Sequence, residues 1–161
     1  MAFDETISLL SKAIGIELQI EDGICGFKAG EPEDDAASVN IMISNVEERG
    51  EVLLYADLGN VPPEGREDFY RNLLEANNLF QGTAGATLGL ENGTGLIRLQ
   101  LRENSSIFAN NAEEHVGTFV ETALTWKRIV VDYRSSREES KPTEDTQPDN
   151  SSFMGGLFMQ V

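Results

Sequence analysis

The amino-acid sequence predicts an α+β fold with the element order α-β-β-β-β-α-β-β-α and an antiparallel, twisted sheet. Three segments, at residues 3–14, 64–80 and 116–133, carry apolar residues at helical spacing. Between them, apolar and polar residues alternate in short runs that end at Gly, Pro, Asn or Asp, which is typical of strands joined by hairpin turns. With 161 residues, the chain is long enough for one domain with a substantial core.

The first predicted helix is amphipathic and ends at Gly15, a residue that favours a left-handed C-cap. Its apolar face consists of Phe3, Ile7, Leu10 and Ile14. Residues 16–20 then alternate, and Asp22-Gly23 is typical of a hairpin turn into residues 24–27. We therefore expect two paired strands directly after this helix.

Two more strands are predicted at residues 39–43 and 52–56. In the first, Val39, Ile41 and Ile43 share one face, and Met42 lies on the other. The second is apolar on both faces, so we expect both of its faces to be covered.

The second half of the chain predicts a helix from about Glu64 to Phe80, a hairpin at residues 86–90 and 96–102, and a long helix. A polar spacer at residues 103–111 precedes this long helix. Apolar residues recur on one face of this helix at alternating steps of three and four: Val116, Phe119, Ala123, Trp126, Val130 and Tyr133.

The glycines around Gly82 and Gly85 invite a comparison with a phosphate-binding loop. Such a loop needs a Lys and a Ser or Thr at the start of a following helix, whereas these glycines follow a helix and precede a strand. The structural interpretation is favoured, in which the glycines form a helix cap and a turn.

Candidate catalytic and metal-binding residues are few. Cys25 has only Lys28 as a basic neighbour in sequence, which favours a buried structural thiol. The single histidine, His115, lacks partners for catalysis and is interpreted as a surface residue. The acidic loop at residues 33–35 lacks the spacing of a calcium-binding EF-hand. We expect no enzymatic activity, no cofactor and no metal.

The net charge of −16 predicts an acidic surface, which repels nucleic acids and anionic lipids. The N-terminal residues show no signal-peptide pattern, and no run approaches the roughly 18 apolar residues of a membrane span. A single cysteine excludes an internal disulfide. We expect a cytoplasmic protein without nucleic-acid binding or membrane insertion.

The C-terminal region differs in composition from the rest. We expect a domain at residues 1–133, a disordered linker at 134–152 and an apolar motif at 153–161. The large apolar residues of the motif are Phe153, Met154, Leu157, Phe158 and Met159. We interpret the motif as a docking peptide for a protein partner; the alternative is that it folds back onto its own dimer and covers a binding groove.

The segment Leu73-Leu74-Glu75-Ala76-Asn77, followed by residues 80–90, resembles a helix end, glycine turn and strand of the Tir-chaperone (CesT-like) family of type III secretion chaperones. That family has a glycine more often at the position of Ala84. The aromatic-rich helix from Phe119 to Trp126 is similar to the closing helix of the family, and the resemblance covers residues 3–133.

The resemblance implies a small helix-sheet-helix sandwich that forms a homodimer and has no catalytic activity. It also implies that the protein binds the N-terminal region of secreted effector proteins in extended form and presents it to the secretion apparatus, whose ATPase or sorting components are further possible partners. The cargo-binding residues implied are Phe3, Ile7, Leu10, Ile14, Val39, Ile41 and Ile43. The dimer interface implied comprises Val52, Leu54, Tyr70, Leu73, Leu74 and Asn77.

Two alternatives stay open at this point. All of the apolar residues implied to bind cargo could be core, since periodicity does not tell an exposed face from a buried one. The protein could also be an acidic protein-binding adaptor or anti-activator that acts through its C-terminal motif.

Overall fold

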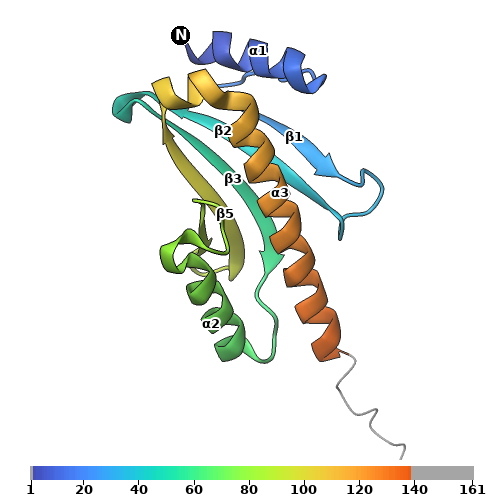
Figure 1. Cartoon of the computed structure of the whole chain (residues 1–161). Coiled ribbons are helices and arrows are strands. Elements are labelled where there is room, and N and C mark those ends of the chain that lie inside the picture. Colours follow the sequence, from blue (N-terminus) through green and yellow to red (C-terminus); the bar gives the residue numbers. More distant parts are fainter. Residues whose placement is uncertain (1, 139–161) are drawn as a thin grey trace, which may run out of the picture.

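The computed structural model describes residues 2–138 and contains three α-helices, two short 3-10 helices and five strands in that range (Figure 1). In chain order the elements are α1 (Phe3–Ile14), β1 (Ile24–Gly30), β2 (Ser38–Val46), η1 (Glu47–Arg49), β3 (Glu51–Asn60), α2 (Arg66–Asn77), η2 (Asn78–Phe80), β4 (Thr87–Leu90), β5 (Leu96–Asn104) and α3 (Ser105–Glu138).

The five strands form one antiparallel sheet in the order β1-β2-β3-β5-β4. The long helix α3 crosses one face of this sheet diagonally (Figure 1). Alternate residues of the central strands point toward it and are buried, among them Ile41 of β2, Leu54 of β3 and Leu99 of β5. From α3 they meet Phe119 and Ala123, which confirms the apolar stripe predicted for this helix.

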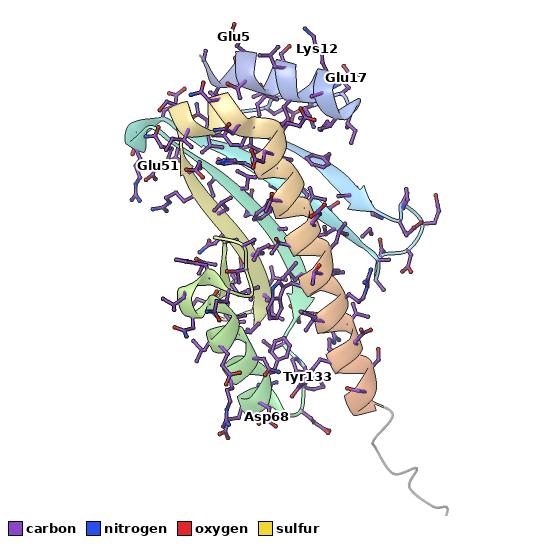
Figure 2. All side chains as sticks on the ribbon, in the orientation of Figure 1. Glu5, Lys12, Glu17, Glu51, Asp68 and Tyr133 are labelled. Atoms are coloured by element: carbon purple, nitrogen blue, oxygen red, sulfur yellow. The ribbon has the colours of Figure 1, made fainter. Side chains whose placement is uncertain are left out.

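The helix α2 lies on the same side of the sheet as α3, beside β4 (Figure 1). The ring of Tyr133 packs at 5.0 Å from that of Phe69, and its Oη donates a hydrogen bond of 3.1 Å to the carbonyl oxygen of Gly65. Figure 2 shows Tyr133 reaching from α3 toward α2. The helix α1 lies across the first turns of α3 at the opposite end of the molecule.

The α+β class and the antiparallel sheet are confirmed, but the number of strands is five instead of six. Residues 16–20 form no strand, because Leu18 turns into the core while its backbone N–H donates to Ser11 Oγ at 3.2 Å. One isolated bridge between Glu21 and Ile24 is all that remains of the predicted pairing.

Three helix boundaries also differ from the prediction. α2 ends at Asn77, and a 3-10 turn continues the chain to Phe80. α3 begins at Ser105 within the predicted polar spacer, and a break at Asn111 (φ −136°, ψ 28°) separates its first turns from the rest. α3 also continues to Glu138, so the first residues assigned to a disordered linker are helical. The motif at 153–161 lies outside the described residues.

The glycine-rich stretch after α2 is a structural turn, as predicted. A Cβ placed on Gly82 would lie 2.9 Å from the Cβ of Ala76, so only glycine lets the chain pass this close to the helix. The Gly82 N–H donates to the Ala76 carbonyl oxygen at 3.1 Å, and Trp126 Nε1 donates to the Gly82 carbonyl oxygen at 2.8 Å. The turn thereby connects α2 to α3.

Candidate protein-binding surfaces

The residues predicted to bind cargo lie mostly inside the protein. Five of them are buried in the core: Ile7, Leu10, Val39, Ile41 and Ile43. This location corrects the prediction for Ile7 and the three β2 residues, because a side chain without accessible surface cannot contact another protein while the fold stays intact. Leu10 is the exception, since it borders an open cavity. The apolar stripe of α1 packs against α3, and the stripe of β2 faces α3. Phe3 and Ile14 are half-buried at the rim of this core.

A different part of α1 is accessible. Leu9 is 51% exposed and lines a cavity of about 140 Å³ between α1 and the first turns of α3. We call this the α1 cavity; its lining is Thr6, Leu9, Leu10, Ala13, Ala109, Ala112 and Glu113. Sequence reasoning missed Leu9 because the residue lies beside the apolar stripe and not within it. The cavity has the size of one apolar side chain.

The face of the sheet opposite α3 is half-exposed. Leu53 and Tyr55 of β3 lie there next to arginines of β5. Arg98 Nε donates to Asp57 Oδ1 at 2.7 Å, and this hydrogen bond raises the pKa of the guanidinium above its ordinary value. The Arg98 guanidinium carbon lies 5.4 Å from the ring centroid of Tyr55. Both faces of β3 were expected to be covered; within residues 2–138 only the face toward α3 is.

The end of α2 carries a second exposed apolar group. Leu74 is 70% exposed and Leu79 is 77% exposed, and Phe80 is also mostly accessible. We call these three residues the α2 surface. Leu79 and Phe80 both have left-handed backbone angles, with φ of 53° and 56°, which cost free energy for residues with a side chain.

The predicted dimer interface is divided by the structure. Val52, Leu54 and Leu73 are buried in the core and are not accessible to a second chain, which corrects their assignment. Tyr70 is half-buried and packs at the core margin. Asn77 is half-buried and holds β4: its Nδ2 donates to the Leu88 carbonyl oxygen at 2.9 Å, and its Oδ1 accepts from the Leu88 N–H at 2.8 Å. Leu74 alone is widely exposed.

The strand β1 forms a free edge of the sheet. Two backbone hydrogen bonds of 2.9 Å tie Ile24 to Glu21, so Ile24 turns its N–H and C=O away from β2. Since this orientation alternates along an antiparallel pair, Gly26 and Lys28 also turn their N–H and C=O groups outward. No other strand of the described residues lies beside them, so the edge can accept an added strand.

The residues considered for catalysis or metal binding are buried in the core or paired with neighbouring side chains. Cys25 is a buried free thiol, as predicted, and burial raises its pKa to about 11. His115 is half-buried, with Nδ1 at 3.2 Å from Glu103 Oε2. In the acidic loop, Asp35 pairs with Lys28 at 3.0 Å, and this hydrogen bond lowers the pKa of Asp35. Among the described residues, no three His, Cys, Asp or Glu side chains gather as a metal-binding group.

No helix within residues 2–138 combines the length and hydropathy needed to cross a bilayer.

Residues 5–127 match the model of the Tir chaperone protein (CesT) family. The chain belongs to this family. Membership confirms the resemblance drawn from the sequence, and with it the predicted class: the protein is a type III secretion chaperone and not an enzyme. The match spans all of the surfaces described above and ends within α3.

Solved structures share the fold at low sequence identity. A chain of the HopA1–SchA chaperone–effector complex has a TM-score of 0.59 at 16% identity, covering 78% of this chain and 92% of its own. A chain of the ExsC–ExsE complex has a TM-score of 0.60 at 19% identity, covering 79% and 92%. A chain of the heterodimeric ExoU–SpcU complex from the type III secretion system of Pseudomonas aeruginosa has a TM-score of 0.58 at 16% identity, covering 78% and 95%. Comparison with curated proteins finds no match.

Proposed function

We propose that this Tir-family chaperone binds the N-terminal region of one or more secreted effectors in extended form in the bacterial cytoplasm. It keeps this region competent for secretion and hands it to the secretion apparatus, where the ATPase or a sorting component receives it. The observation that carries the proposal is the free edge of β1 on a family member that also leaves the α1 cavity open. A chain of similar fold occurs in a complex described as a chaperone–effector complex.

An extended cargo segment can use both features. Its backbone pairs with the outward N–H and C=O groups of Gly26 and Lys28, as in recognition by strand addition. An apolar side chain elsewhere in the cargo fills the α1 cavity beside Leu9 and Ala13. Backbone pairing tolerates many sequences, and the side-chain anchor adds selectivity.

The test is co-expression with candidate effectors encoded nearby, followed by co-purification. Leu9→Asp and Ala13→Asp place a charge at exposed positions of the α1 cavity and should abolish co-purification while the fold remains intact. Ile129→Asp is the matched control, because Ile129 is also an exposed apolar residue on a helix but lies outside the cavity. Retention of the effector by both cavity variants would place the binding site elsewhere.

We further propose a homodimer that forms through the α2 surface. Three large apolar side chains on α2 and the 3-10 turn that follows it, two of them in a costly backbone conformation, are consistent with an interface. Light scattering on the wild type should give the mass of two chains, and Leu79→Asp should give the mass of one with unchanged circular dichroism. A monomeric wild type at micromolar concentration would exclude the dimer.

A further inference from the structure

We propose that the C-terminal segment Phe153–Val161 docks as an added antiparallel strand on the free edge of β1 in its own chain. It occupies the position of the sixth strand that the sequence predicts and the fold lacks. The consequence that the segment competes with cargo rests on the proposed function; the docking itself does not. The argument uses the backbone of β1, the side chains beside it, and the length and charge of the chain that follows α3.

The edge of β1 is vacant because the preceding segment leaves it. After the bridge between Glu21 and Ile24, the chain toward α1 departs, and Leu18 is held in the core by packing and by the bond to Ser11. The outward N–H and C=O groups of Gly26 and Lys28 therefore have no neighbouring strand within the described residues. Exposed strand edges of this kind pair readily with another extended segment.

An apolar ledge borders this edge. Phe27 and Ala29 of β1 and Val120 and Leu124 of α3 are only partly buried at the margin of the core. The end of β1 comes close to α3, since a Cβ on Gly30 would lie 2.8 Å from Leu124 Cδ2. A strand added to β1 would extend the layer that faces α3 and would bury apolar side chains against this ledge.

The distance from α3 suits the chain that follows it. Between Leu124, which lies beside Gly30, and Glu138, the helix rises about 21 Å. For a connecting segment as long as residues 139–152, polymer statistics give a root-mean-square span of about 20 Å. The segment at 153–161 can thus return to the Gly30 end of β1 without stretching, and it enters antiparallel to β1. A tether matched to its span gives an effective concentration of order millimolar, so a weak strand contact is enough for docking.

Charge favours the same return path. Residues 139–152 contain four acidic residues and one basic residue, Lys141. Along the second half of α3, the described side chains include Lys127, Arg128 and Arg134. Lys127 and Lys28 line one cavity of about 340 Å³ together with Asp35, which pairs with Lys28, and Asp57. The attraction along this path therefore comes from the basic residues of α3.

The segment also has a suitable side-chain pattern. Leu157, Met159 and Val161 alternate with Phe158 and Gln160. As a strand, the segment would direct the first three side chains to one face, where the ledge of Phe27 and Leu124 lies, and would leave Phe158 and Gln160 on the other.

Paramagnetic relaxation in full-length protein tests the docking. A nitroxide on Gln160→Cys can be attached selectively, because the only native cysteine, Cys25, is buried. We expect at least a twofold loss of amide signal intensity at Gly26 and Lys28 and no change at Leu74. The control is the same label with Leu157→Asp and Met159→Asp, which should restore the β1 signals. Loss of signal at α2 instead, or at no described residue, would overturn the proposal.

A mixed sample separates docking within one chain from docking between copies. Spin-labelled protein without ¹⁵N is added to ¹⁵N-labelled protein without the spin label, and the β1 signals should stay unchanged. Their loss would mean that the segment binds another copy, which contradicts docking in its own chain.

Truncation after Glu138 then tests the competition with cargo. The truncated protein should bind the effector at least threefold more tightly than the full chain, because the β1 edge no longer has to be vacated. If the relaxation experiment shows docking and the effector affinity does not change, the docking stands and the use of this edge by cargo is wrong. If truncation weakens effector binding, the segment contacts the cargo directly, and competition is excluded.

Discussion

Cys25 is a buried side chain that makes the stability of the fold depend on pH. Its thiol lies in the core on β1, and burial raises its pKa from 9.0 to about 11. The folded state therefore holds the proton more tightly than the unfolded state. The associated stability is fully present below about pH 9 and is lost as the pH rises through the folded pKa.

We predict that the free energy of unfolding falls between pH 8 and about pH 10.5 more steeply for the wild type than for Cys25→Ala. The variant should be less stable than the wild type at pH 8, because it loses packing in the core. Urea unfolding at the two pH values measures the difference. Equal losses for both proteins would show that other groups cause the alkaline dependence.

Asn77 is the residue that attaches the strand β4 to α2, through its two hydrogen bonds with the backbone of Leu88. Asn77→Ala should lower the free energy of unfolding by about 1–3 kcal/mol, because it leaves backbone groups without partners in a partly buried place. Asn92→Ala, in the exposed turn between β4 and β5, is the matched control and should change little. A similar effect of both variants in urea unfolding would contradict this role.

At the scale of the elements, the passage between α2 and β4 depends on the close contact between Gly82 and Ala76. Gly82→Ala should destabilise the protein by about 1–3 kcal/mol, since the new methyl group meets the backbone of a helix. Gly89→Ala is the control, because a Cβ at that position of β4 meets nothing within 4 Å. Thermal unfolding of the two variants should separate them clearly. Equal melting temperatures would mean that the turn accommodates the added methyl group without loss of stability.

The elements were predictable where the pattern and the packing agree. The stripe from Phe119 to Val130 predicted α3 correctly, because a long apolar face has only the sheet to cover it. Alternation at residues 16–20 predicted a strand wrongly. The pattern reflects the burial of the Leu18 side chain, but it does not show whether the backbone pairs with another strand. Periodicity also placed Ile7 and Ile41 on one face of their elements, but burial of that face depends on contacts between distant segments. Exposed residues such as Leu79 carry no periodic signal.

At the scale of the whole molecule, the net charge of −16 dominates the electrostatic energy of the folded state. Like charges repel in the compact state, and salt screens this repulsion. We predict that the melting temperature rises at neutral pH when NaCl increases from about 20 to 200 mM. The same increase should have little effect close to pH 4.3, because the net charge is near zero at the isoelectric point. A melting temperature that falls with salt at neutral pH would show that the ion pairs outweigh the repulsion.

The break in α3 at Asn111 determines how the α1 cavity can adapt to its occupant. Ala109 lies before the break and Ala112 after it, so the two alanine walls of the cavity belong to different helical segments. A small rotation about the Asn111 backbone changes the distance between these walls and leaves the sheet in place. We therefore propose that rotation at this single joint would let the cavity fit cargo anchor side chains of different volume.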